Sequence, residues 1–239
     1  MPHPLITYFE RRDSLSTEEK AILERITHNR ESFPARTLII RQGSQPARSC
    51  VLLQGIAFRE HLLRSGKRMI SAVHIAGDFL DLHGLLLAKM DHDVRSAGEC
   101  TVAWIAHKEI VKISETHPHL GRLLWMTIAA DASLTRAAVS VVGRLNPPAK
   151  LAHMACELYL RMADVGLARN LSFDLAVTQL DLADMFGLST VHLNRSMQVL
   201  RSTGAISWEG QRVVIHDWDR LTEIAEFDPT YLNLEPKRR

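Results

Sequence analysis

The segment that most constrains this chain is TQLDLADMFGLSTVHLNRSMQVLRSTGAI, residues 178–206. It reads as two short amphipathic helices separated by a glycine. Thr178 and Asp181 have the spacing of a capping box, which predicts that the first helix begins after Thr178. Gly187 predicts where this helix ends, because a left-handed residue commonly closes a helix and glycine adopts that conformation without strain. Two short helices joined in this way form a helix-turn-helix, whose second helix enters the DNA major groove.

Each of the two predicted helices has an apolar face, which leaves a polar face outward. The expected buried residues are Leu180, Leu182, Ala183 and Phe186 in the first helix and Leu188, Leu193, Met197 and Leu200 in the second. Arginine pairs with guanine, asparagine pairs with adenine, and hydroxyl groups contact phosphates. We therefore expect DNA contacts from the outward polar residues, which are Thr178, Gln179, Ser189, Thr190, His192, Asn194, Arg195 and Gln198.

A β-hairpin is predicted directly after these helices, in the segment GAISWEGQRVVIHD. Its strands are expected at residues 205–208 and 212–215, around a turn at Glu209–Gly210. Two helices alone could be a packing unit with a solvated polar face. A helix-turn-helix followed by a hairpin is a winged helix, which favours a DNA-binding domain.

Composition limits the remaining possibilities. The net charge of +2 does not by itself demand a polyanionic partner. A local basic face is permitted by arginines in the C-terminal third, at positions 161, 169, 195, 201 and 212. The three cysteines are far apart and suit a reducing compartment. Because no apolar run approaches the roughly 18 residues of a membrane span and no signal peptide is recognised, we expect a cytoplasmic protein.

Glycine and proline spacing divides the rest of the chain. Glycines at 43, 55, 66 and 77 separate short apolar runs, which predicts an all-β sandwich or barrel. A long helical stretch follows, and Pro147–Pro148 interrupts it. We expect an α+β protein with three parts: an effector-sensing β-barrel of the jelly-roll type at 1–117, a dimerisation helix and hinge at 118–145, and a winged helix-turn-helix domain at 146–239.

The long helix carries a heptad-like stripe and is expected to pair with a second copy of the chain. The stripe consists of Leu120, Leu124, Thr127, Asp131, Leu134, Ala138 and Val141. Asp131 would be costly in a dry core, but near a two-fold axis it could specify the register of the pair. The alternative is that the helix lies across its own barrel.

This order of parts resembles the CRP/FNR family of bacterial transcription regulators. The resemblance covers nearly the whole chain, and its most specific pieces are GDFLDLHGLL, the later RSA, and GLSTVHLNRSMQVLRSTGAI. It implies a homodimer that reads a palindromic DNA site, a barrel that binds a small effector, and RNA polymerase as a partner. Arg195 matches the arginine that family members direct at bases. Val191 stands where many members carry glutamate and Thr190 where some carry arginine, so His192 and Asn194 are candidates to complete the base-reading set.

The effector site implied by the resemblance comprises Asp81, Leu82, His83, Arg95 and Ser96. In cyclic-nucleotide members an Arg-Ser pair holds the cyclic phosphate, and Arg95 and Ser96 match that pair. Leu82 replaces the glutamate that holds the ribose, and Asp81 adds a negative charge. Because an unmatched buried polar group costs about 1–3 kcal/mol, the residues disfavour cyclic AMP. The alternative role of Arg95 is an ion pair with Asp91 or Asp93.

Other cofactors and an enzymatic role were weighed in the same way. An iron-sulfur cluster typically takes four thiolates, which the barrel half does not supply, so none is expected. Haem and metal ions are not expected either, although a haem-responsive or cyclic AMP-responsive regulator remains an alternative. The histidines of this half show no pattern of paired ligands: His74, His83, His92, His107, His117 and His119.

Enzyme signatures are missing from the sequence. It contains no GxxxxGK[ST], HExxH or GxSxG motif, so we predict no catalytic residues and no enzyme. The rival class is a ligand-binding or enzymatic barrel with an appended helical domain. The sequence does not determine the effector, the operator, the regulated genes, or the choice between activation and repression.

Overall fold

The computed structural model describes residues 3–238, which fall into two compact units. The first unit comprises the chain up to His61, Ala72–Ala132 and the C-terminal segment from Leu234. The second comprises Leu62–Ser71 and Ser133–Asn233. None of the helices in the described part of the chain combines the length and the apolar character that a membrane span needs.

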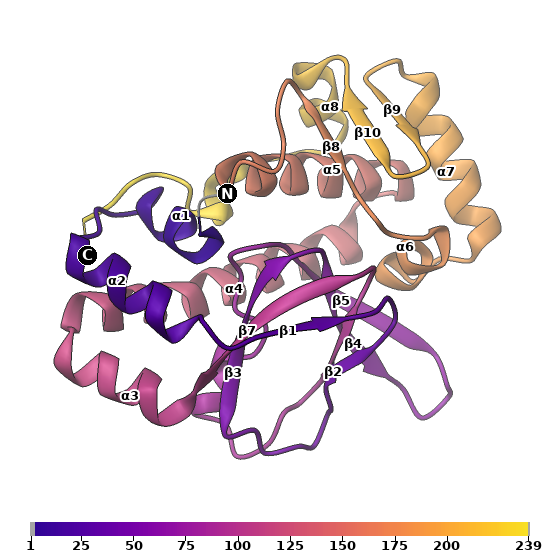
Figure 1. Cartoon of the computed structure of the whole chain (residues 1–239). Helices are drawn as coiled ribbons and strands as arrows, with labels where there is room; N and C mark the ends of the chain where they lie inside the picture. Colours follow the sequence, from indigo (N-terminus) through magenta and orange to yellow (C-terminus); the bar gives the residue numbers. More distant parts are fainter. Residues whose placement is uncertain (1–2, 239) are drawn as a thin grey trace. The chain divides into compact units, whose positions relative to one another are not determined.

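Two sheets form a jelly-roll sandwich, and most of their strands belong to the first unit (Figure 1). The first sheet has the order β1-β7-β3, with bounds Arg30–Phe33, Cys100–Ala106 and Arg48–Gln54. The second has the order β2-β6-β4-β5, with bounds Leu38–Ile40, Asp93–Ser96, Ala57–Leu62 and Arg68–His74. The predicted jelly-roll class is confirmed, although the two sheets do not close into a barrel.

Strands β3 and β7 are buried on both faces. Successive side chains of a strand point to opposite faces. Cys50 and Leu52 of β3 therefore join the core between the two sheets, together with Trp104 of β7. Val51 and Ile105 join a second core that lies under the helices of this unit. Burial on both faces explains why CVLL is a continuous apolar run without polar alternation.

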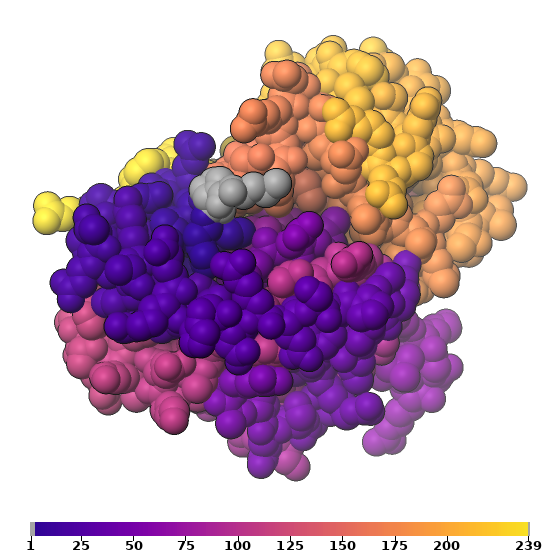
Figure 2. Space-filling model, viewed as in Figure 1, coloured from indigo at the N-terminus to yellow at the C-terminus, as the bar shows by residue number. Residues whose placement is uncertain are grey.

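Helices supply the other side of that second core. They are α1 (Pro4–Glu10), α2 (Thr17–Ile26), α3 (His107–Thr116) and the beginning of α4 (Pro118–Arg144). A capping box begins α2: Ser16 Oγ accepts from Glu19 N, and Glu19 Oε2 accepts from Ser16 N. Figure 2 shows the indigo atoms of the N-terminal segment closely packed on this unit. The sequence pattern did not predict α1, whose seven residues are too few for a clear period.

Gly55 closes the turn between β3 and β4. Its φ of +87° is a conformation that L side chains rarely adopt. A Cβ at this position would lie 2.4 Å from the carbonyl oxygen of Glu99. Both the turn and the close approach of residues 99–100 therefore require glycine.

The second unit contains a winged-helix arrangement. It comprises α5 (Pro147–Asp164), β8 (Ser172–Asp174), α6 (Gln179–Phe186), α7 (Thr190–Ser202), β9 (Ile206–Glu209), β10 (Arg212–Ile215) and α8 (Trp218–Ile224), followed by a 3-10 turn, η2 (Pro229–Leu232). The strands form a sheet of order β8-β10-β9. The two prolines interrupt the helical stretch as predicted, and a new helix, α5, begins there with Asn146 as its cap, which accepts from Ala149 N at 3.1 Å. The three-residue strand β8 was not predicted.

All three cysteines are buried free thiols. Burial raises the pKa of Cys100 to about 11 and that of Cys156 to about 12. A thiol with a pKa this high is a weak nucleophile and a weak metal ligand at neutral pH.

Candidate nucleic-acid interface and effector region

Local interactions define both ends of α6. Thr178 Oγ1 accepts from Asp181 N at 3.2 Å, and Asp181 Oδ2 accepts from Thr178 N at 2.9 Å. Gly187 closes α6 in the left-handed region with φ of +64°. The predicted capping box and the predicted helix end are both confirmed.

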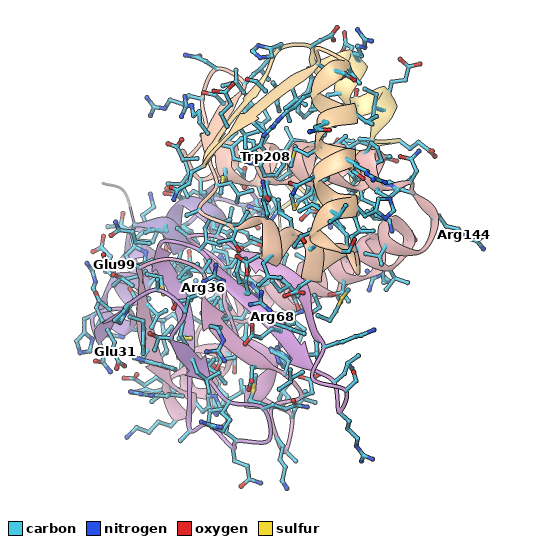
Figure 3. The ribbon with its side chains drawn as sticks, turned by 90° about the vertical axis from the view of Figure 1, so that its right-hand side faces the viewer. Glu31, Arg36, Arg68, Glu99, Arg144 and Trp208 are labelled. Carbon is cyan, nitrogen blue, oxygen red and sulfur yellow. The ribbon has the colours of Figure 1, made fainter. Side chains whose placement is uncertain are left out.

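Helix α7 separates a buried face from an exposed polar face. Leu193, Met197 and Leu200 are buried, as expected. Figure 3 looks onto this helix and its projecting side chains. The residues predicted to contact DNA are all exposed: Thr178, Gln179, Ser189, Thr190, His192, Asn194, Arg195 and Gln198.

One buried position in α6 was predicted wrongly. Leu180 is 56% exposed, whereas Leu182, Ala183 and Phe186 are buried. Residues two apart on a helix point to nearly opposite sides, because each residue advances about 100° around the axis. Leu180 therefore cannot share the buried face with Leu182.

Arg195 differs from neighbouring arginines in its partners. Within residues 3–238 its guanidinium takes part in no hydrogen bond or ion pair. Arg201 instead donates to the carbonyl of Trp208, which is labelled on β9 in Figure 3. Arg212 donates to Asp174 at 3.2 Å and to Ser172 at 2.7 Å. Of these three arginines, only Arg195 has a guanidinium without a partner among the described residues, so it is the one available to bind another molecule.

The beginning of α7 can receive a phosphate. Ser189 Oγ accepts from His192 N at 3.2 Å, and its own hydroxyl proton can still be donated. The first turn contains no acidic residue. The partial positive charge of a helix N-terminus favours an anion at this end.

The hairpin predicted after α7 is present, with its turn one residue later than expected. Arg212 pairs with Glu209 across the hairpin, so the two-residue loop is Gly210–Gln211. Gly210 has φ of +56°, which this tight loop uses. Strand β8 pairs with the other edge of β10 and completes the wing sheet.

Asp81, one of the residues expected to face an effector, lies inside the first unit. Its Oδ1 accepts from Cys50 N at 2.7 Å, and the residue has no exposed surface. Burial raises the pKa of this carboxyl to about 7, although the hydrogen bond from Cys50 opposes the shift. Leu82 is also buried, within the core under the helices. The buried position of Asp81 therefore does not support the expectation that its carboxylate adds a negative charge beside an effector.

Arg95 and Ser96 also have partners within the chain. Arg95 Nε donates to Glu60 Oε1 at 2.5 Å and Nη1 donates to the carbonyl of Arg36 at 3.0 Å. The ion pair proposed for Arg95 exists, but its partner is Glu60 and not Asp91 or Asp93. Ser96 Oγ donates to the carbonyl of Pro34 at 2.7 Å and accepts from Thr37 N at 2.8 Å. Both side chains thus tie β6 to neighbouring segments.

His83 is half-buried and lies on a 3-10 turn, η1 (Leu82–Leu85). It meets His92 at a ring-centroid separation of 5.1 Å. His92 is 2% exposed, and its Nδ1 lies 2.6 Å from Asp91 Oδ1. Sequence reasoning singled out His83 but not Asp91 or His92 as site residues, because no linear motif joins these three positions.

The other histidines of this unit are engaged elsewhere. His119 lies 2.6 Å from Glu19 and 3.2 Å from Asp13, and His107 lies 3.0 Å from Ser49 Oγ. His74 Nδ1 lies 3.8 Å from Asp78, and His117 Nε2 lies 3.7 Å from Glu18.

A winged helix-turn-helix with an exposed polar recognition helix, on the same chain as a jelly-roll unit, defines a DNA-binding regulator with a sensor domain. Comparison with known families supports this class of protein. Residues 30–117 match the cyclic nucleotide-binding domain, and residues 149–224 match the Crp-like helix-turn-helix domain. The chain belongs to the CRP/FNR family of transcription regulators, as its resemblance implied.

Individual relatives span most of the chain. The transcriptional activator protein FnrL of Cereibacter sphaeroides is 28% identical over 217 residues, which are 89% of this chain and 86% of FnrL. A probable transcriptional activator of Rhizobium leguminosarum bv. viciae is 25% identical over 193 residues, 80% of this chain and 79% of that protein. The structure of FixK2 from Bradyrhizobium japonicum shares the fold, with a TM-score of 0.70 at 19% identity over 82% of this chain and 96% of FixK2.

Proposed function

We propose that the protein is a cytoplasmic homodimer that binds a palindromic DNA site and regulates transcription through RNA polymerase, without enzymatic activity. The observation that carries this proposal is the exposed Arg195 on α7, whose guanidinium has no partner among the described residues. An arginine in this position can pair with both acceptors of a guanine. Asn194 and His192 are exposed beside it and are proposed to contact further bases.

Val191 is proposed as an addition to the reading set. Its apolar side chain is 61% exposed at the start of α7, so most of its surface is not buried against the rest of the chain. Apolar side chains recognise the methyl group of thymine in the major groove. Where many family members carry glutamate, this chain would therefore favour a thymine.

The dimer is proposed to form along α4, but not along the whole predicted stripe. Leu120 and Leu124 are 1% and 7% exposed and belong to the core of their own unit. Trp125 and Val139 are each 69% exposed, and Ala132 lies exposed seven residues from both. Seven-residue spacing keeps side chains on one side of a supercoiled helix pair. These three residues support a seam on one side of α4. The half-buried Leu134 and Ala138 of the original stripe lie on nearly the opposite side, because each residue advances about 100° around the helix axis, so they belong to an alternative seam.

We propose the expected division of roles: sensing by residues 1–117, dimerisation by 118–145 and DNA binding by 146–239. The internal bonds of Arg95 and Ser96 support an effector other than cyclic AMP. Selection from a random DNA library tests the proposal. We expect palindromes with half-site centres about one helical turn apart, bound with a strong salt dependence. A protein that enriches no sequence and shows no salt-dependent mobility shift would contradict it.

A further inference from the structure

The first unit contains three potential metal ligands that come together from two segments. His83 lies on η1, while Asp91 and His92 precede β6. One ligand atom from each residue can be chosen so that all three lie within 4.8 Å of one another. In a tetrahedral zinc site the ligand atoms are about 3.3 Å apart, given bonds of about 2.0–2.1 Å. The cluster therefore needs a contraction of only about 1–1.5 Å to close around an ion.

Unpartnered buried nitrogens are the second observation. The Nε2 atoms of His83 and His92 are both buried and have no hydrogen-bond partner. A buried polar atom without a partner is costly and calls for an explanation such as a bound ion. Of the two, the Nε2 atom of His83 is the one that lies near a third potential ligand, 3.8 Å from Asp91 Oδ1.

Asp91 Oδ1 lies close to one nitrogen of each histidine. It is 2.6 Å from His92 Nδ1 and 3.8 Å from His83 Nε2. One carboxylate cannot accept the Nδ1 proton of His92 and also bind an ion on the opposite nitrogen of that ring, so an ion shared by all three residues takes the place of this proton, and His92 binds it through Nδ1. The Asp91 side chain is 66% exposed, which gives an ion a route from solvent.

The charge state of both imidazoles is compatible with ligation. Burial, followed by the nearby Arg59 guanidinium, lowers the pKa of His92 to about 4 and lowers that of His83. Neutral imidazole is the form that binds metals. The positive charge of Arg59 opposes a cation, but its Nη2 donates to both carboxylate oxygens of Asp131 at 2.8 Å. That ion pair offsets the charge that the site would otherwise meet.

We propose that His83, Asp91 and His92 bind one divalent transition-metal ion of the zinc type. Two imidazoles and one carboxylate suit zinc and its neighbours better than magnesium or calcium, which prefer oxygen ligands. Three protein ligands leave a fourth position for water or a small anion. His83 also lies in the region that family resemblance assigns to the effector. A role of the metal as the effector rests on the proposed function, whereas the metal site itself does not.

The site is tested by calorimetric titration of the chelator-treated full-length protein with Zn²⁺, repeated with Co²⁺ to record its visible spectrum. We expect one ion per chain. His83→Gln and Asp91→Asn should each weaken binding at least about tenfold. His28→Gln removes an exposed histidine of the same unit and should bind like the wild type. His92→Gln is a less secure variant because that residue is buried, so the other two decide the outcome.

Failure of the wild type to bind Zn²⁺ would overturn the site, as would unchanged binding by both His83→Gln and Asp91→Asn. Mobility shifts with the selected DNA, with and without Zn²⁺, separate the two proposals. If Zn²⁺ binds but DNA affinity does not change, the metal is not the effector. Salt-dependent DNA binding by a protein that binds no Zn²⁺ would keep the proposed function and remove the metal site.

Discussion

Arg59 of β4 and Asp131 of α4 form an ion pair within the first unit, in which one guanidinium nitrogen contacts both carboxylate oxygens. Arg59 Nη2 lies 2.8 Å from each carboxylate oxygen of Asp131. The Arg59 side chain is only 10% exposed, and that of Asp131 is 34% exposed. This pairing gives Asp131 a role inside its own chain, in addition to any role in the register of a dimer.

Asp131→Ala is expected to lower the free energy of unfolding by about 1.5–3 kcal/mol, the range for hydrogen bonds to charged groups. The loss arises because the guanidinium stays largely buried while its carboxylate partner is removed. Denaturant unfolding at a fixed protein concentration measures it. Arg136→Ala removes an exposed charge from the same helix and should change stability by less than about 0.5 kcal/mol. Equal effects of the two substitutions would contradict a specific ion pair.

Trp125→Glu should convert the proposed dimer to a monomer, whereas Leu134→Glu should do so only if the original stripe forms the seam. A glutamate in the seam places two like charges near the two-fold axis, where the low dielectric cannot solvate them. Sedimentation velocity at micromolar concentration measures the change. Val111→Glu is the matched control, because Val111 is an apolar residue of α3 that is 41% exposed. A wild type that already sediments as a monomer would remove the seam.

Arg195→Ala should cost about 1–3 kcal/mol per half-site and relax the preference at one base pair. Binding to a panel of single-base operator variants measures both effects. Arg220→Ala removes the same charge from an exposed position on α8 and should leave the preference unchanged. Ser189→Ala, at a predicted phosphate contact, should weaken all operators evenly. If Arg195→Ala selects the same motif with the same affinity, Arg195 does not read a base.

Asp81→Asn should become increasingly stabilising relative to the wild type as the pH rises. The folded pKa of about 7 lies above the usual value, so between about pH 4 and 7 the folded state holds a proton that the unfolded state has lost. Raising the pH through this window therefore destabilises the wild type. Asparagine keeps an acceptor for Cys50 N but cannot ionise.

The difference in unfolding free energy between Asp81→Asn and the wild type should grow by up to about 1.4 kcal/mol per pH unit in that window. Denaturant titrations at several pH values between 4 and 8 measure it. A difference that stays constant with pH would show that the Asp81 carboxyl does not titrate in this range.

Cyclic AMP at millimolar concentration should leave the melting midpoint and the operator affinity nearly unchanged. A ligand at 100 times its dissociation constant stabilises the folded state by about 2.7 kcal/mol, which is visible as several degrees in a protein of this size. Arg95 is bonded to Glu60 and Leu82 offers no acceptor for a ribose hydroxyl. A clear rise with micromolar cyclic AMP that Arg95→Ala abolishes would restore the nucleotide site.

Short-range interactions made much of the DNA-binding unit predictable. The capping box of α6 joins residues three apart, Thr178 with Asp181. Gly187 ends α6 through its own backbone conformation. These features depend on a few consecutive residues, so the sequence alone contains the information needed to place them. The exposed polar face of α7 follows from the same helical periodicity.

The first unit was less predictable at the level of side-chain partners. The pairing of β4 with β6 places Glu60 opposite Asp93 and Phe58 opposite Arg95. Arg95 therefore reaches Glu60, which is 35 residues away in the sequence, and not the acidic residues beside it. Strand register decides this partner, and register is set by the packing of whole sheets.

The sequence by itself determined the order of the elements, the caps of the recognition helices and the family. Tertiary structure alone decided that Leu120 and Leu124 belong to their own core, and that His83 meets His92. An apolar stripe on a helix specifies that a face is buried but not which surface covers it. Likewise, two histidines in separate segments become neighbours only when loops and strands pack, because their separation along the chain carries no geometric constraint.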